Sequence, residues 1–180
     1  MRKIDELLSE YGESHQNDTN KLIHWICVPC IFFSIVGLIF SFPSSFLSEL
    51  LPFMGYFANW ATFALLVILF YYLSLSVSLT LGMCLFSVFC LALANFLALT
   101  FPGKLAFISI GIFVIAWILQ FYGHKIEGKK PSFLKDLQFL MIGPAWLMHF
   151  IYKRIGIAYW INRRQSSGIY FISFQKAPLV

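Results

Sequence analysis

Charged residues are scarce in this sequence, and their scarcity excludes an ordinary water-soluble fold. Only 12% of the 180 residues are Asp, Glu, Lys or Arg and 59% are hydrophobic, whereas soluble domains have about 25% charged and about 45–50% apolar residues. A chain this short has too much surface to hide such a composition from water. The net charge of +5 forms no basic stripe with interleaved aromatic residues, which argues against a nucleic-acid-binding surface. The sequence therefore predicts an integral membrane protein.

Several functional motifs are also absent. The chain has no G-x-x-x-x-G-K-[ST] loop, no H-E-x-x-H motif and no G-x-S-x-G motif. It lacks the clustered multi-histidine boxes of membrane desaturases and hydroxylases. No charged residue lies in the middle of an expected span, which argues against an ion-coupled pump or a channel. The first twenty residues are polar, so we expect no cleaved signal peptide and a first apolar run that stays as a membrane anchor.

The four cysteines, Cys27, Cys30, Cys84 and Cys90, all lie inside apolar runs. Cys27 and Cys30 match C-x-x-C, a pattern that can indicate a redox or metal-binding pair. No βαβ pattern surrounds this motif, and no second C-x-x-C accompanies it. We therefore interpret both cysteines as small apolar residues of a spanning helix and expect no disulfide.

Apolar runs long enough to cross a bilayer dominate the chain, since about twenty apolar residues span the hydrocarbon. The expected spans are Leu22–Ser41, two helices within Ala58–Phe101, and Leu105–Tyr122. The Ala58–Phe101 run is too long for one helix, and its natural break lies near Ser78–Gly82. Residues 1–13 have apolar side chains at spacings of three and four, which predicts a short amphipathic helix.

The positive charges predict the orientation, because Lys and Arg concentrate in cytoplasmic segments. With four spans and a cytoplasmic N-terminus, only Lys104, in a Pro-Gly turn between spans, lies on the far side. A fifth span through residues 137–152 would carry four later bases across the membrane. We therefore expect a re-entrant or interfacial hairpin there, broken at Gly143-Pro144 and buried by the other helices.

The predicted fold is thus an all-α membrane protein. It has about four transmembrane helices, the N-terminal amphipathic helix and the hairpin near 137–152. Residues 1–155 are expected to form a single helical domain, and residues 156–180 a C-terminal tail. The membrane is expected to be a bacterial inner membrane or that of the endoplasmic reticulum.

The four histidines gather at one predicted membrane face. His15 and His24 flank the cytoplasmic entry of the first span. His124 lies at the exit of the fourth span, and His149 lies in the hairpin on that side. Three further polar side chains join them there: Asn20, Gln120 and Glu127. Any single histidine can instead bind backbone or lipid headgroups, but a shared face favours a metal site for the set, because imidazole binds iron, zinc, copper and nickel.

Two polar motifs near this face resemble those of a known family. They are Tyr11-Gly12-x-x-His15-x-x-x-x-Asn20-x-x-x-His24-x-x-x-x-Pro29 and Gln120-x-x-Gly123-His124-x-x-Glu127-x-x-x-Pro131, followed by Gly143-Pro144. Over residues 8–155 the chain resembles the iron-dependent 2-hydroxy fatty acid dioxygenases, which are small membrane proteins of fatty acid α-oxidation. The resemblance implies oxidative removal of one carbon from a 2-hydroxy fatty acid, with carbon dioxide as a product, O2 as oxidant and Fe(II) as cofactor.

The resemblance also suggests a role for each polar residue. The expected metal ligands are His15, His24, His124 and His149. Glu127 is expected as a further ligand or as an acceptor for the N–H of a ligating imidazole. Asn20 and Gln120 are expected to orient these groups, and Tyr11 to donate a hydrogen bond to the substrate. The acyl chain would lie among the spans, in contact with the bilayer, and the polar head at the cytoplasmic face.

Two other functions stay open from the sequence. One is a non-enzymatic membrane scaffold or lipid-binding protein, which requires no metal. The other is a zinc-dependent membrane hydrolase, since zinc accepts imidazole as iron does. The sequence also leaves open the acyl chain length, the oligomeric state, and whether one or two irons bind.

Overall fold

Every regular element of the described chain is helical. The computed structural model describes residues 3–13, 15–128 and 133–156. The helices are α1 (Lys3–Glu13), α2 (Asp18–Phe40), α3 (Ser45–Leu50), the 3-10 helix η1 (Pro52–Phe57), α4 (Trp60–Leu75), α5 (Val77–Thr100), α6 (Leu105–Glu127) and α7 (Phe133–Arg154). No strand occurs in these ranges, so the expected all-α class is confirmed. Apart from Gly156, the expected tail at 156–180 lies outside the described residues.

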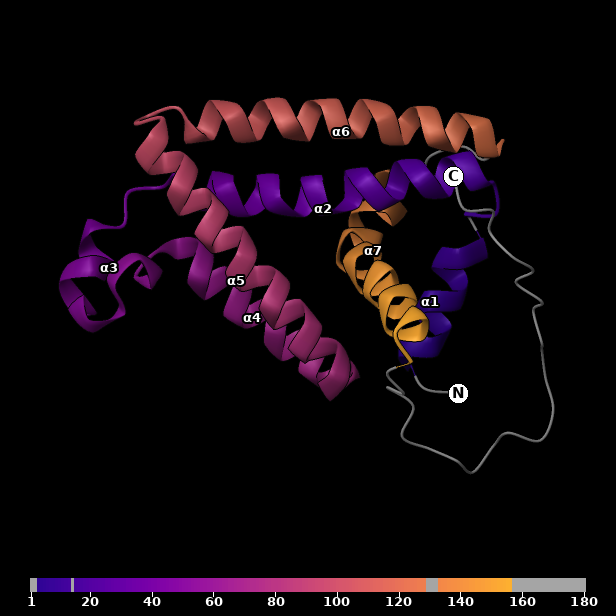
Figure 1. Cartoon of the computed structure of the whole chain (residues 1–180), viewed down its shortest axis with the longest axis horizontal. Helices are drawn as coiled ribbons and strands as arrows, with labels where there is room; N and C mark the ends of the chain where they lie inside the picture. Colours follow the sequence, from indigo (N-terminus) through magenta and orange to yellow (C-terminus); the bar gives the residue numbers. More distant parts are fainter. Residues whose placement is uncertain (1–2, 14, 129–132, 157–180) are drawn as a thin grey trace.

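Helices α2 and α6 lie side by side along most of their length (Figure 1). Contacts at both ends show that they are antiparallel. Gly37, late in α2, lies against Ser109, early in α6, whereas Glu127 at the end of α6 bonds to Asn20 at the start of α2. Helices α4 and α5 form a second pair that crosses α2 obliquely, and α1 and α7 lie near the end of the first pair where α2 begins (Figure 1).

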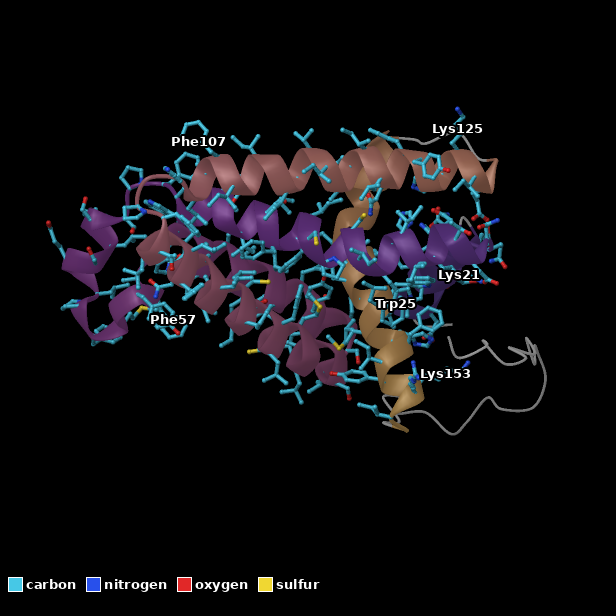
Figure 2. All side chains as sticks on the ribbon, turned by 45° about the horizontal axis from the view of Figure 1, so that its top comes forward. Lys21, Trp25, Phe57, Phe107, Lys125 and Lys153 are labelled. Carbon is cyan, nitrogen blue, oxygen red and sulfur yellow. The ribbon has the colours of Figure 1, made fainter. Side chains whose placement is uncertain are left out.

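Three of the described helices are long and apolar enough to cross a membrane. They are α2, α5 and α6, with mean hydropathies of 2.3, 2.3 and 2.2. Helix α4 is apolar but has only 16 residues, or about 24 Å of helix against a hydrocarbon core of about 30 Å. The structure therefore gives three candidate spans and one shorter apolar helix, and the count of about four stays a prediction. Large apolar side chains such as Phe107, 75% exposed, point outward as lipid contact requires (Figure 2).

The junction between α4 and α5 falls at Ser76, just before the break expected at Ser78–Gly82. Ser76 is extended, with φ −168° and ψ 128°, and its N–H donates to the Tyr72 carbonyl at 2.8 Å. Neither proline nor glycine occurs at the junction, so the sequence carries little signal for its position. The Pro-Gly turn before α6 lies where it was expected, with Gly103 in the left-handed region at φ 72°.

The prediction of a hairpin at residues 137–152 is wrong, because α7 is one continuous helix with Pro144 inside it. Proline removes a backbone donor, and the preceding glycine weakens the helix further. Hydrogen bonds to neighbouring helices hold the segment. Tyr72 donates to the Met141 carbonyl in α7, and Tyr152 donates to a carbonyl of α5 at 2.7 Å. Packing against α4 and α5 therefore overrides the local break signal, while an interfacial position for α7 stays a prediction.

Helix α1 is amphipathic, as expected, and it packs against α7. Ile4, Leu8 and Tyr11 on its apolar face are buried. A Cβ on Gly143 of α7 would lie 3.3 Å from the Tyr11 hydroxyl and 3.1 Å from Cγ1 of Val28 in α2. The missing side chain thus allows α7 to fit closely between α1 and α2.

All four cysteines are free. Cys27 is buried in a small apolar cluster with Ile31 and Trp117, and Cys30 packs against the edge of that cluster. This environment agrees with the expected packing role, and the expected absence of a disulfide holds for both residues.

Replacing Gly82 with alanine is expected to destabilise the packing of α5 against α7. A Cβ there would overlap the Tyr152 hydroxyl and lie 2.7 Å from the Met148 sulfur, so the Tyr152 hydrogen bond would break. Overpacking of this kind costs about 1–3 kcal/mol. Gly111→Ala in α6 is the matched control, because nothing lies within 4 Å of that Cβ position. Thermal unfolding followed by circular dichroism should give a lower midpoint for Gly82→Ala than for the control, and equal midpoints would contradict this packing.

Candidate metal centre

Three histidines from separate segments meet at one end of the α2–α6 pair. His15 lies in the connector between α1 and α2, His24 in α2, and His124 in the last turn of α6. All three are buried, and their candidate ligand nitrogens lie within 4.8 Å of one another. The ring centroids are 4.2 Å apart for His15 and His24, 5.0 Å for His24 and His124, and 5.5 Å for His15 and His124. The structure thus brings together three of the four expected ligands.

Backbone carbonyl groups hold two of these imidazoles by their Nδ1 atoms. The Nδ1 of His15 lies 2.6 Å from the Tyr11 carbonyl oxygen, and the Nδ1 of His24 lies 2.9 Å from the Asn20 carbonyl oxygen. Because a carbonyl can only accept, Nδ1 carries the hydrogen in each neutral ring and donates it. Nε2 then keeps its lone pair, which is the state that a metal ligand requires.

The Glu127 carboxylate is bonded to the start of α2. Its Oε1 accepts from the Gln16 N–H at 2.8 Å, and its Oε2 accepts from the Asn17 N–H and from the Asn20 side-chain amide, both at 3.0 Å. A helix N-terminus favours an anion at this place, because its backbone N–H groups point outward. Glu127 therefore ties the end of α6 to the connector that carries His15. The expected role of Glu127 as a metal ligand or as an acceptor for an imidazole N–H stays a prediction.

The close approach of α2 and α6 at this level depends on Gly123. A Cβ on Gly123 would overlap the side-chain oxygen of Asn20, which is fully buried. Asn20 links the two helices, since its side chain donates to Glu127 and its carbonyl accepts from His24. Gln120 is also buried, one turn before the histidine of α6 and on the same helical face. Both residues expected to orient the site therefore lie beside the cluster.

Tyr11 and Trp146 form an aromatic wall against His15. The Tyr11 ring stacks on the imidazole, with centroids 4.2 Å apart and 13° between the planes. The Trp146 centroid lies 5.6 Å from His15 and 5.2 Å from Tyr11. Sequence reasoning did not assign Trp146 to the site, because the contact joins α7 to a distant connector and no local spacing signals it. The sequence feature nearest to Trp146 that indicated an unusual local structure is the Gly143-Pro144 motif.

His149 lies outside the three-histidine cluster. It follows Trp146 by one helical turn, and the tryptophan takes the place beside His15. The His149 ring contacts Phe150 edge-on, with centroids 5.5 Å apart. Burial lowers the pKa of His149 below its usual value, the nearby Lys153 ammonium lowers it further, and the Asp5 carboxylate raises it. The structure therefore brings together three of the four expected ligands, and a ligand role for His149 stays a prediction.

The clustered donors fit a bound transition metal. Neutral imidazoles bind iron, zinc, copper and nickel, and a centre with three protein ligands leaves positions open for substrate. A metal about 2.1 Å from each nitrogen requires nitrogens no more than about 4.2 Å apart. The upper limit of 4.8 Å in the structure lies close to this value, so small side-chain movements would complete the coordination.

Comparisons with known proteins give matches that cover most of the chain. A model of the family described as "Mpo1-like: 2-hydroxy-palmitic acid dioxygenase Mpo1-like" matches residues 1–155. The chain is also similar to the Saccharomyces cerevisiae protein "2-hydroxy-palmitic acid dioxygenase MPO1", with 31% identity over 149 residues, which is 81% of this chain and 78% of that protein. No solved structure gives a significant match. The region that the family model matches contains all three clustered histidines.

Glu127→Gln is expected to weaken metal binding by about 10–100-fold, the usual effect of losing a group that orients a ligand. The amide keeps one acceptor oxygen but turns an NH2 group toward the backbone N–H groups that the carboxylate now accepts from, so the connector with His15 loosens. Glu49→Gln, an exposed site in α3 at the opposite end of the α2–α6 pair, is the matched control. Anaerobic Co(II) titration measures both affinities. An unchanged affinity for Glu127→Gln would show that the tether does not support the site.

Gly123→Ala is expected to lower the metal content of the protein, because its Cβ would push α6 away from Asn20 and separate His24 from His124. Gly111→Ala makes the same change on the same helix in open space and should bind metal normally. Elemental analysis after anaerobic Fe(II) loading gives the metal per chain. Equal loading of the two variants would mean that close helix approach is not needed for the site.

Proposed function

This chain belongs to the Mpo1-like family, and on that premise we propose that it is an Fe(II)-dependent dioxygenase that removes one carbon from 2-hydroxy fatty acids. The observation that carries the proposal is the buried cluster of His15, His24 and His124, a donor set suited to iron. The printed name of the yeast relative, 2-hydroxy-palmitic acid dioxygenase, supports the substrate class. We take residues 1–155 as the single helical membrane domain that performs this reaction.

The proposed reaction balances without an outside reductant. A 2-hydroxy acid, R–CHOH–COOH, and O2 give R–COOH, CO2 and H2O. The bond between C1 and C2 breaks, C1 leaves as CO2, and C2 becomes the carboxyl carbon of the shortened acid. Since the substrate supplies all four electrons that reduce O2, no second organic substrate is required.

His15, His24 and His124 would hold the iron. When bound there, Fe(II) would supply the centre that activates O2 and attracts the hydroxyl and carboxylate oxygens of the substrate. The proposed iron site is preorganised in the chain. Carbonyl acceptors hold the Nδ1 hydrogens of His15 and His24, so that each ring keeps a lone pair on Nε2. Because the rings are already gathered and buried, few side chains need to be ordered on binding.

The surrounding polar residues would support the substrate and the ligands. Glu127 holds the connector of His15 through the start of α2. Asn20 bridges α2 and α6 at the level of the cluster. Gln120, buried one turn before His124, would orient the substrate head with its amide, and the Tyr11 hydroxyl would donate a hydrogen bond to the substrate.

The position of the site suits an amphiphilic substrate. The cluster lies at one end of the apolar α2–α6 pair, so an acyl chain can lie along apolar helices while the polar head reaches the histidines. Lys21 and Lys125 lie at this end of the pair (Figure 2), and Lys104 precedes α6 at the other. From this distribution we place the site and the N-terminus on the cytoplasmic side, in a bacterial inner membrane or that of the endoplasmic reticulum.

His24→Ala and His124→Ala are each expected to lose bound iron and turnover together, because each removes one of three ligands. His149→Ala is the matched control and should keep both, since His149 lies outside the cluster. The measurements are iron per chain after anaerobic Fe(II) loading, and O2 consumption with formation of pentadecanoic acid from 2-hydroxypalmitic acid.

Three outcomes would change this assignment. Loss of iron from His149→Ala would make His149 the fourth ligand, brought in by a shift of α7. Absence of iron from the loaded wild-type protein would overturn the dioxygenase. Bound zinc without O2 consumption would instead favour a hydrolase.

A further inference from the structure

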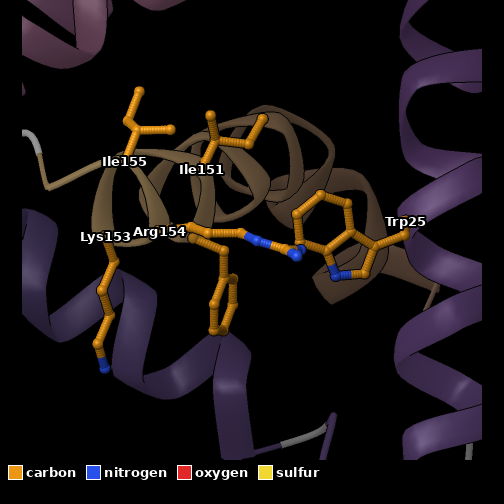
Figure 3. Close-up of a pocket in the computed structure, with 6 residues that line it drawn as sticks. Trp25, Ile151, Lys153, Arg154 and Ile155 are labelled. Atoms are coloured by element: carbon orange, nitrogen blue, oxygen red, sulfur yellow. The ribbon is translucent and has the colours of Figure 1, made fainter. Parts of the chain in front are cut away.

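A second feature near the site is a pocket between α2 and the last turns of α7 (Figure 3). Its volume of about 410 Å³ falls within the range of about 300–1,000 Å³ found for small-molecule sites. The lining residues are Trp25, Phe150, Ile151, Lys153, Arg154 and Ile155. Its walls are therefore mostly apolar, with two cations from the end of α7.

The two cationic side chains point in different directions. Arg154 extends across the pocket toward Trp25, whereas the ammonium end of Lys153, which also lines the pocket, is directed away from Trp25 (Figure 3). No acidic side chain of the described ranges forms an ion pair with Arg154. By contrast, Lys21 at the start of α2 is bonded to Asp18 at 3.1 Å. The pocket thus combines an apolar surface with one guanidinium that is available to an anion, and guanidinium pairs well with a carboxylate.

A continuous series of aromatic rings connects this pocket with the histidine cluster. The Trp25 and Phe150 centroids lie 6.2 Å apart across the pocket. Phe150 lies 4.5 Å from Trp146, and Trp146 lies 5.6 Å from His15. The pocket wall is therefore separated from His15, a histidine of the cluster, by one aromatic residue, Trp146.

We propose that this pocket binds a long-chain fatty acid, with its carboxylate on Arg154 and the first part of its chain against Trp25, Phe150 and Ile151. The choice of a fatty acid as the occupant rests on the proposed function; the charge and the apolar walls come from the pocket itself. The lining offers no side-chain acceptor for the hydrogen of a 2-hydroxyl group. The pocket is thus a docking site that takes hydroxylated and plain fatty acids alike, one aromatic layer from the centre that would select the hydroxylated acid.

Photo-crosslinking of the full chain tests this proposal directly. The protein is placed in phosphatidylcholine nanodiscs and labelled with a diazirine analogue of palmitic acid, and the labelled peptides are located by mass spectrometry. Label is expected on α7 near Ile151 and on α2 near Trp25. Palmitate and 2-hydroxypalmitate should compete equally, and uncharged hexadecanol should compete weakly.

Arg154→Gln is expected to raise the palmitate concentration for half-competition about tenfold, as expected for losing a hydrogen-bonded charge partner. Lys153→Gln is the matched control, with the same charge change on the adjacent residue, whose ammonium end is directed away from Trp25, and it should shift this concentration less than twofold. Ile151→Trp should reduce labelling by filling the pocket. Circular dichroism and gel filtration confirm that these variants fold, as their exposed positions suggest.

Equal effects of Arg154→Gln and Lys153→Gln would overturn the proposal. So would labelling elsewhere on the chain, equal competition by hexadecanol, or competition by phosphatidylglycerol in place of palmitate. Labelling requires neither iron nor O2, so its result is independent of turnover. Labelling without turnover would support the fatty acid pocket and contradict the dioxygenase activity. Turnover without labelling would support the dioxygenase activity and contradict the pocket.

Discussion

The carboxylate of Glu127 at the N-terminus of α2 is the interaction on which the candidate site depends. It accepts from two backbone N–H groups of the connector and from the Asn20 side chain. A carboxylate at the C-terminal end of α6 is electrostatically unfavourable, because the macrodipole of α6 makes that end negative. The positive N-terminus of α2 offsets this unfavourable interaction. The antiparallel pairing of α2 and α6 brings these two ends together. Without this contact, the connector that carries His15 would lose its hydrogen bonds to the end of α6.

Close packing sets the register of the two helices that carry His24 and His124. A bilayer provides no hydrophobic driving force between helices, so small residues and polar contacts determine how they pair. Gly37 against Ser109 fixes one end of the α2–α6 pair, and Gly123 against Asn20 fixes the other. A slip of one helical turn, about 5.4 Å, would break both contacts and carry the two imidazoles out of reach of a common metal.

Sequence patterns predicted those parts of the structure that depend on local composition. Apolar runs predicted α2 and α6, and the alternation of spans predicted four histidines at one membrane face, of which three form the cluster. The path of α7 could not be predicted, because Gly143-Pro144 signals a break while the stabilising bonds of Tyr72 and Tyr152 come from contacts with other helices. The same tertiary packing puts Trp146 against His15 and leaves His149 outside the cluster. No regular residue spacing in the sequence predicts either of these two positions.

The three clustered histidines are held by two different kinds of support. His24 and His124 sit on the paired α2 and α6, while His15 sits on a connector held by the Tyr11 stack and by Trp146 of α7. The three-histidine cluster is complete only when α1 and α7 have docked, so the proposed metal binding and this docking would stabilise each other by linkage. The proposed fatty acid pocket shares this layer, because Phe150 contacts Trp146. An acid that moves from the pocket to the cluster would therefore displace aromatic side chains of α7 and leave the α2–α6 pair in place.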